Sequence, residues 1–165
     1  MTSRSLAAAE PFLITQEYEN YTAEQHSVWS ELMRRRLPQV REYACREFLE
    51  GYDVIGLRDD QLPNLRGITE RLKPRTQWST TAVSGFLPPN AFFEMLEARM
   101  FPATTWLRSR DSLAYIPEPD IFHDVFGHVP LLTNPVFANY MEAYGKGGLR
   151  AMKFGRLKNL SALYW

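Results

Sequence analysis

The chain has 165 residues, the size of a single domain, and can bury roughly two thirds of the surface that its unfolded form exposes. Its 19 basic and 19 acidic residues leave no net charge, so we expect neither nucleic acid nor an anionic membrane as a partner. The single cysteine excludes an internal disulfide, and no apolar run approaches the roughly 20 residues of a membrane span, so we expect a cytoplasmic protein.

The first predicted element is an N-terminal arm, residues 1–18, which carries little hydrophobic periodicity. Thr22 and Gln25 then form a capping-box pattern that predicts the start of a helix, and apolar residues follow at helical spacing. Pro38 breaks or kinks this pattern, which resumes afterwards and stops at Gly51. We therefore expect two helices or one bent helix in this region.

Three features of this region receive no chemical role. Cys45 is expected to be a small buried apolar residue on a helix face. The basic run 34–36 is typical of a solvated helix face, and His26 is expected to lie at the surface.

The middle of the chain predicts two further helices around a short strand. Pro63 stands at a probable first helical position, and the amphipathic stretch after it ends at Lys73-Pro74. Residues 80–87 are rich in Thr, Val and Phe and predict a short strand. Asn90 is a plausible cap for a helix that continues through Arg99.

The last third predicts one more strand and further helices. Residues 104–107 are a candidate second strand, and Asp120 can cap a helix that runs through Phe126. Asn134 starts another helix that is expected to end at Gly145, and residues 150–165 form a candidate last helix. The predicted fold class is therefore mainly α with a small β element.

The most informative segment contains two of the three histidines, His123 and His128, beside carboxylates at Glu118, Asp120 and Asp124. Neutral imidazoles and carboxylates are ligands for divalent transition metals. Positions five apart on an ideal helix are turned about 140° from each other, so the helix must end or distort between the histidines. By themselves the two histidines favour a metal site and a structural role equally.

The surroundings of the histidines resemble one family. The run Pro-Glu-Pro-Asp-Ile-Phe-His-Asp-Val-Phe-Gly-His-Val-Pro-Leu-Leu, which begins at Pro117, is similar to the iron-binding signature of the pterin-dependent aromatic amino acid hydroxylases, above all the bacterial phenylalanine 4-monooxygenases. The stretches 85–89, 44–51 and 21–29 also resemble that family. The resemblance implies that residues 19–165 form the hydroxylase catalytic domain, without its C-terminal part.

The resemblance implies that His123 and His128 bind Fe(2+) together with a glutamate a few residues after a Tyr-Trp pair. This chain ends at Tyr164-Trp165, so the third ligand is expected to be absent. Asp120, almost one turn before His123, is better placed to replace it than the adjacent Asp124, but we expect neither to do so. We expect these acids to cap a helix and to accept hydrogen bonds from imidazole N–H groups.

The resemblance also assigns the residues that bind the tetrahydropterin cofactor and the substrate. They are Gly85, Phe86, Leu87, Phe92 and Tyr164 for the pterin, and Arg108, Pro119, Asp120 and Trp165 for the substrate. Arg108 would hold the substrate carboxylate while Asp120 steadies the arginine. By themselves, Phe92 and Arg108 would be interpreted as a core aromatic residue and as an ordinary charged residue after a strand.

The implied function is the conversion of L-phenylalanine to tyrosine with O2 by a monomeric iron(II)- and tetrahydropterin-dependent monooxygenase. The alternative is a truncated, non-catalytic homologue that retains part of the metal, pterin or amino acid binding. A helical metalloprotein of other chemistry, such as a hydrolase, lacks a recognisable general base. Tryptophan hydroxylation is a further alternative within the family.

Overall fold

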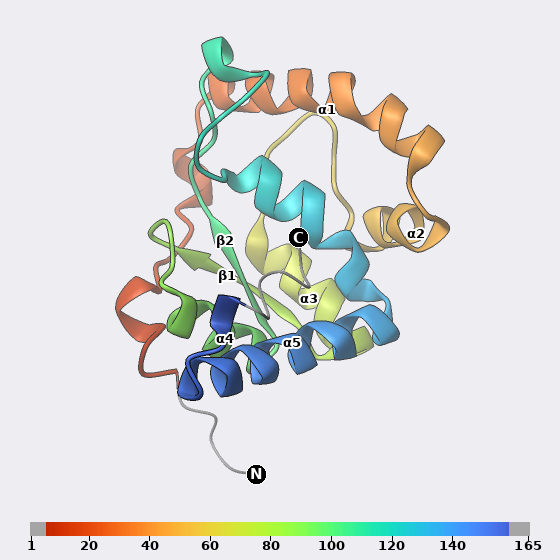
Figure 1. The fold of residues 1–165 in the computed structure, drawn as a ribbon. Helices are drawn as coiled ribbons and strands as arrows, with labels where there is room; N and C mark the ends of the chain where they lie inside the picture. Colours follow the sequence, from red (N-terminus) through yellow and green to blue (C-terminus); the bar gives the residue numbers. More distant parts are fainter. Residues whose placement is uncertain (1–5, 159–165) are drawn as a thin grey trace.

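Helices dominate the chain, as predicted (Figure 1). The computed structural model describes residues 6–158. The α-helices and strands are α1 (Ala23–Tyr43), α2 (Arg46–Ile55), α3 (Leu65–Thr76), β1 (Ser79–Val83), α4 (Pro89–Glu97), β2 (Met100–Thr104) and α5 (Pro135–Lys153). Short 3-10 turns lie at η1 (Glu10–Phe12), η2 (Tyr18–Asn20), η3 (Arg110–Ser112) and η5 (Pro130–Thr133), and the π-helical segment η4 spans Phe122–Phe126. No helix within residues 6–158 is long and apolar enough to cross a bilayer.

The sheet consists of the two parallel strands β1 and β2, joined by α4. Their register runs from Ser79 opposite Met100 to Val83 opposite Thr104. Because the strands are parallel, the segments that follow Val83 and Thr104 leave the sheet at the same edge. This edge brings together stretches that are about 20 residues apart in sequence.

The main core lies between the long helices, the sheet and the segment η4. Trp29 of α1 is fully buried, packs edge-on against Phe122 at 5.3 Å between ring centroids, and donates its indole N–H to the carbonyl of Arg58. Trp78, also fully buried, donates its indole N–H to the carbonyl of Ala138. Both tryptophans therefore bury a large apolar surface without an unpaired donor.

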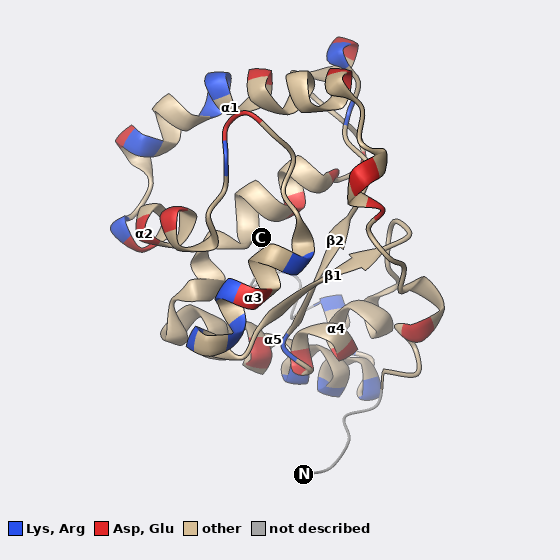
Figure 2. Cartoon of the chain, turned by 180° about the vertical axis from the view of Figure 1, so that it is seen from behind, with Lys and Arg blue, Asp and Glu red and all other residues tan. Residues whose placement is uncertain are grey.

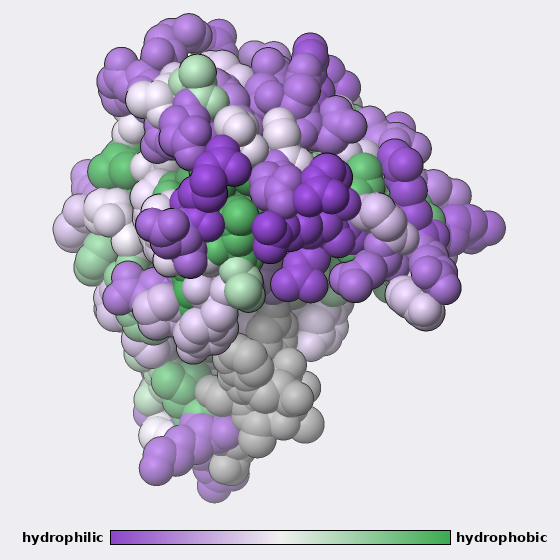
Figure 3. All heavy atoms as spheres, turned by 90° about the horizontal axis from the view of Figure 1, so that it is seen from above, coloured by the Kyte–Doolittle hydropathy of each residue, from purple (hydrophilic) through white to green (hydrophobic). Residues whose placement is uncertain are grey.

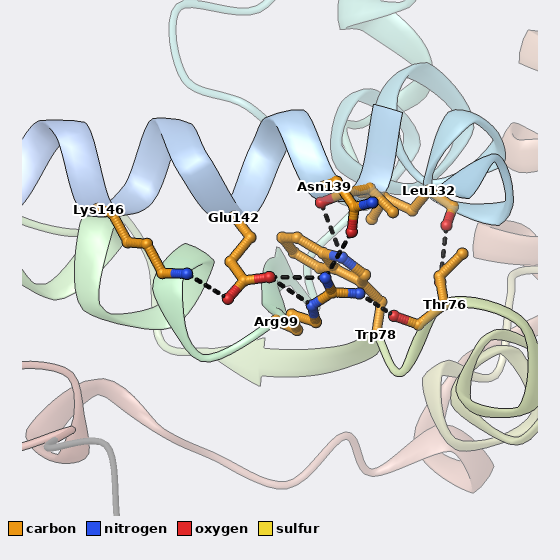
Figure 4. Close-up of polar contacts among 8 residues, drawn as sticks. Thr76, Trp78, Arg99, Leu132, Asn139, Glu142 and Lys146 are labelled. Atoms are coloured by element: carbon orange, nitrogen blue, oxygen red, sulfur yellow. Dashed lines mark hydrogen bonds and ion pairs between the residues drawn. The ribbon is translucent and has the colours of Figure 1, made fainter. Parts of the chain in front are cut away.

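A polar network fastens α5 to the turn between α4 and β2 (Figure 4). Arg99, held at a positive φ of 57°, donates to Glu142 at 2.7 Å, to the carbonyl of Thr76 at 2.6 Å and to Asn139 at 2.6 Å. Lys146 donates to the second carboxylate oxygen of Glu142 at 2.7 Å. The guanidinium thus joins the end of α3 and the middle of α5 to the turn before β2, which explains why this turn tolerates a left-handed non-glycine residue.

The exterior of α1 is charged, as expected for the basic run 34–36 (Figure 2). Arg34 and Arg35 are exposed and both pair with Glu31, one turn away on the same helix. The face viewed from above, on the side where α1 lies in Figure 1, is largely hydrophilic, with smaller hydrophobic patches (Figure 3). The solvated helix face is therefore confirmed.

The start of the first helix was predicted correctly, but several helix ends were wrong. Thr22 and Gln25 make the predicted reciprocal capping box. Pro38 is exposed and lies inside α1, which continues to Tyr43. Proline donates no hydrogen bond to the carbonyl one turn earlier, but on the solvent side of a helix this carbonyl can bond to water. The next helix passes through Gly51 and ends at Ile55, followed by Gly56, whose φ of 66° allows a left-handed cap.

Two side chains in this region also differ from expectation. Cys45 is exposed at the N-cap of α2, not buried on a helix face. His26 is half-buried, and its Nδ1 accepts a hydrogen bond from the backbone N–H of Leu62 at 3.1 Å. His26 therefore has a structural role that the sequence did not indicate.

The elements in the middle of the chain are displaced by a few residues from the prediction. The helix predicted to begin at Pro63 begins at Leu65 instead. Asn64 caps it by accepting a hydrogen bond from the N–H of Gly67, and the helix continues through Pro74. The first strand ends at Val83, and α4 begins at Pro89, with Asn90 inside it. Predicted boundaries are commonly displaced in this way when they rest on local signals alone.

The second strand and the last helix required larger corrections. β2 occupies 100–104, not 104–107, and contains Pro102, which is tolerated because β1 is the only strand paired with β2 in the described part of the chain. Asn134 caps α5 as predicted, but this helix continues through Gly145 to Lys153, so no separate helix starts at Arg150. Residues 157–158 are helical, and the rest of the predicted last helix, 159–165, lies outside the described residues. Gly145 was interpreted as a stop, whereas it allows close packing of α5 on the end of α4.

Candidate metal and cofactor site

His123 and His128 converge on one face of a distorted helix. Their Nε2 atoms lie 3.2 Å apart. The backbone from Phe122 to Phe126 is π-helical, and in this conformation residues five apart stand one above the other. The predicted distortion is therefore confirmed, and it is a π-helical turn in right-handed backbone, since Gly127 has a φ of −75°.

The spacing of the two imidazoles suits a shared metal ion. Two nitrogens bound at about 2.1 Å with an angle of about 90–109° at the ion are separated by about 3.0–3.4 Å. The 3.2 Å between the two Nε2 atoms falls in this range. Burial, together with the neighbouring His123, lowers the pKa of His128 to about 4, so this imidazole is neutral at neutral pH. Neutral imidazole is the form that binds metals.

The nearby carboxylates are occupied by other contacts. Asp120 accepts a hydrogen bond from the backbone N–H of His123 at 3.0 Å, which is the predicted helix-capping role. Asp124 accepts from both the N–H and the hydroxyl of Thr104, at 2.9 and 2.8 Å, instead of from an imidazole. Burial raises the pKa of Asp124 despite these hydrogen bonds. No group of three or more potential metal-binding side chains occurs within residues 6–158.

Arg108 and Asp120 form a buried, two-pronged ion pair. The Nε and Nη2 atoms of Arg108 donate to the two oxygens of Asp120, each at 2.8 Å, and the backbone N–H of Arg108 adds a third bond at 3.1 Å. Burial opposes ionisation of Asp120, but the hydrogen bonds from Arg108 and from the N–H of His123 outweigh it and lower the pKa of this carboxyl. Arg108 also lies over the ring of Phe122, 5.7 Å from its centroid.

These groups gather at the carboxyl edge of the sheet. The Gly85–Leu87 segment follows β1, and Arg108 follows β2, while Val83 and Thr104 are opposite each other in the register. Thr104 in turn holds Asp124, the residue next to His123. The parallel sheet therefore brings the predicted pterin segment, the predicted substrate arginine and the histidine pair to one edge.

The predicted pterin residues form an open turn beside a small apolar cluster. Gly85 has φ of 151°, and a Cβ built on it would meet no atom within 4 Å. Phe86 is 80% exposed, whereas Leu87 is buried. Phe92 is half-buried and meets the ring of Phe93 edge-on at 5.5 Å. An exposed backbone turn next to an aromatic face could accommodate a flat heterocycle.

The remaining predicted residues are divided between described and undescribed parts of the chain. Pro119 is half-buried in the loop immediately before Asp120. Tyr164 and Trp165, predicted to line the pterin and substrate sites, lie outside the described residues.

Three supporting residues were missed by the sequence reasoning. Thr104 fixes the carboxylate of Asp124, Phe101 packs its ring 5.7 Å from that of His128, and Phe122 lies under Arg108. Thr104 and Phe101 lie in β2, which the sequence placed too late. A correct assignment of β2 would have pointed to Thr104 and Phe101, because residues of a strand that ends beside the histidine segment are expected to contact that segment.

Comparison with known proteins gives concordant matches. A family model described as biopterin-dependent aromatic amino acid hydroxylase matches residues 15–165. The phenylalanine-4-hydroxylase of Caulobacter vibrioides is 48% identical over 158 residues, which cover 96% of this chain and 54% of that protein. The chain spans about half the length of the curated relatives that it matches.

Solved structures of the Chromobacterium violaceum phenylalanine hydroxylase share the fold. One with bound iron(III) and oxidised cofactor 7,8-dihydrobiopterin has a TM-score of 0.89 and 46% identity, covering 95% of this chain and 57% of that chain. One with bound iron and phenylalanine has a TM-score of 0.88 and 45% identity, covering 95% and 56%. These matches confirm the resemblance and the fold class expected from the sequence.

Proposed function

The chain belongs to the biopterin-dependent aromatic amino acid hydroxylases, and we propose that its function is the iron(II)- and tetrahydropterin-dependent conversion of L-phenylalanine to tyrosine with O2. Residues from 19 onwards would form the catalytic-domain segment, and residues 1–18 an arm. The relatives named phenylalanine-4-hydroxylase and the iron-, pterin- and phenylalanine-bound structures of one of them support this assignment. We further propose that the chain is a monomer.

The observation that carries the proposal is the 3.2 Å separation of the Nε2 atoms of His123 and His128. The two histidines would hold iron(II) and leave coordination positions on the opposite side accessible, as two-histidine sites for oxygen chemistry require. Bound iron(II) and tetrahydropterin together would supply the electrons for activating O2. The protein contributes two converging imidazoles, of which His128 is held neutral by burial, and the π-helical backbone positions them on one side of the helix.

The pterin would lie against the turn after β1. The backbone N–H groups of Gly85, Phe86 and Leu87 donate to no other backbone group within residues 6–158, so they are available to a polar ring edge. Phe92 offers an aromatic face from the first turn of α4. Such a combination of free donors and a flat apolar surface suits an amide-like heterocycle.

Arg108 would bind the carboxylate of phenylalanine. Asp120 uses the Nε and one Nη2 hydrogen of the guanidinium, while Nη1 makes only a long 3.5 Å contact with the carbonyl of Leu113. The outer N–H groups of a guanidinium held in this way can bond a second carboxylate. Asp120 therefore acts as a positioning residue that fixes the plane of Arg108.

The proposal is tested by measuring tyrosine formation from phenylalanine with iron(II), tetrahydropterin and O2. We expect turnover that disappears in His128→Ala, and a raised KM for phenylalanine in Arg108→Lys, because a lysine cannot reproduce the two-pronged contact. His26→Asn is the matched control, since His26 lies in α1 and serves a backbone contact. Turnover that survives in His128→Ala would contradict the proposal.

A second candidate function is binding without turnover. The absence of a third metal-binding side chain near the histidines, within residues 6–158, favours it. In this case the chain would bind iron(II), dihydrobiopterin or phenylalanine in a calorimetric titration but would form no tyrosine. Tyrosine formation above the level of an iron and pterin blank would exclude this candidate.

A further inference from the structure

Residues 6–14 of the N-terminal arm, to which the word arm refers from here on, pack directly against residues 84–92, here called the pterin segment. We propose that the arm is a positioning element that holds the pterin segment in its binding conformation. This inference rests on the proposed function, because it assigns the regulation of pterin affinity to that same site.

The arm pairs with the edge of β1 that is not paired with β2. Leu13 forms an antiparallel bridge with Val83, the last residue of β1. The N–H of Ile14 donates to the carbonyl of Ala82 at 3.1 Å, and the N–H of Ser84 donates to the carbonyl of Phe12 at 3.0 Å. The chain is therefore held on both sides at the point where it leaves the sheet to enter the pterin segment.

The side chains of the arm and the pterin segment share one apolar cluster, distinct from the main core. Its buried members are Ala9, Val83, Leu87, Ala91 and Met95, and Leu6, Ala8, Phe12, Leu13, Phe92 and Met100 pack against it. Leu87 and Phe92, which we assign to the pterin site, thus rest on a surface that the arm partly builds. Glu94 of α4 adds a polar contact by accepting the N–H of Ala8 at 2.8 Å.

The pterin segment has few restraints of its own. Gly85 adopts a backbone conformation that few residues favour, and Phe86 is 80% exposed. Because the N–H groups of residues 85–87 donate to no backbone group in the described part of the chain, the turn depends on its two anchors. One anchor is α4, and the other is the arm. A segment ordered in advance loses less conformational freedom when a ligand binds, so the arm raises the affinity for pterin.

A matched pair of variants at Ile14 separates the backbone contact from the side chain. Ile14→Pro removes the N–H that bonds to Ala82, and Leu13 already has the extended conformation, φ −72° and ψ 129°, that a following proline requires. Ile14→Ala keeps this N–H and removes only a side chain that is 41% exposed. Phe12→Ala, a third variant, removes arm packing and leaves the backbone contacts intact.

The measurement is amide hydrogen exchange of the free chain, followed by titration with 7,8-dihydrobiopterin. We expect faster exchange in residues 84–92 for Ile14→Pro and Phe12→Ala, unchanged exchange in α2, and wild-type behaviour for Ile14→Ala. Loss of about one backbone hydrogen bond predicts a roughly fivefold to tenfold weaker affinity for dihydrobiopterin in Ile14→Pro.

The outcomes distinguish this inference from the proposed function. Exchange in residues 84–92 that stays at the wild-type rate in Ile14→Pro and Phe12→Ala would overturn the positioning role, as would faster exchange with unchanged dihydrobiopterin affinity. If the wild-type chain binds no dihydrobiopterin, the assignment of pterin to this site fails and the role in pterin affinity fails with it. Faster exchange in the two variants would then still show that the arm orders residues 84–92.

Discussion

Gly51 gives a sharp test of the packing between α2 and the turn that follows the histidines. An added Cβ would clash with the carbonyl oxygen of Pro130, and would lie 2.6 Å from its carbonyl carbon and 2.7 Å from Oγ1 of Thr133. Two of these atoms belong to the backbone, so the clash is relieved only by separating α2 from η5. The matched control is Gly67→Ala in α3, where no atom lies within 4 Å of the new Cβ.

The two substitutions should change the free energy of unfolding in opposite directions. Alanine is favoured over glycine inside a helix by about 1 kcal/mol, whereas overpacking costs about 1–3 kcal/mol, and a backbone clash belongs at the upper end. We therefore expect Gly51→Ala to lower the free energy of unfolding by about 2 kcal/mol and Gly67→Ala to raise it by about 0.5–1 kcal/mol.

Urea denaturation followed by circular dichroism measures both free energies of unfolding, and thermal melting provides a second readout. At about 2–4 °C per kcal/mol for a chain of this size, Gly51→Ala should melt about 4–8 °C lower than the wild type. Equal stability of the two alanine variants would refute the close contact between α2 and η5.

Three further substitutions test single interactions. Asp120→Asn removes the partner of a buried arginine and should lower the free energy of unfolding by about 3–5 kcal/mol at pH 7. The folded state lowers the pKa of Asp120. The contribution of the ion pair is therefore present above the unfolded pKa of about 3.9 and is lost as the pH falls through the folded pKa. The free energies of unfolding of wild type and variant should converge when unfolding is measured at decreasing pH. Gln77→Gly should raise the free energy of unfolding by about 1 kcal/mol, because Gln77 caps α3 at a φ of 64°. A free energy of unfolding below that of the wild type would contradict the left-handed cap. Thr22→Ala should lower the free energy of unfolding by about 1 kcal/mol through loss of the capping box, and an unchanged urea midpoint would count against that cap.

The starts of α1 and α5 were predictable from sequence because their signals are local. The caps at Thr22 and Asn134 depend on hydrogen bonds between residues two or three positions apart, which the sequence displays directly. Helix ends were less predictable, since Gly51 and Gly145 look like stop signals. Both are instead sites where another backbone packs closely against the helix, a requirement that only the tertiary structure reveals.

The candidate site was predictable in part. The five-residue spacing of His123 and His128 required a distorted helix, but not specifically a π-helix, because several distortions meet the same requirement. Arg108 and Asp120 are 12 residues apart, and only the family resemblance suggested that they pair. The role of Thr104 was missed because the second strand was placed at 104–107 instead of 100–104, where the strand contains Pro102, a residue tolerated in a strand with one free edge.

The most direct test of the metal site is an anaerobic calorimetric titration of the 165-residue chain with iron(II). The account predicts binding in the micromolar range or tighter that weakens at least tenfold in His123→Ala and in His128→Ala. His26→Asn, which changes the third histidine, should bind as the wild type does. A folded wild-type chain that binds no iron(II), or binding that is unchanged in both alanine variants, would contradict the assignment of the histidine pair as metal ligands.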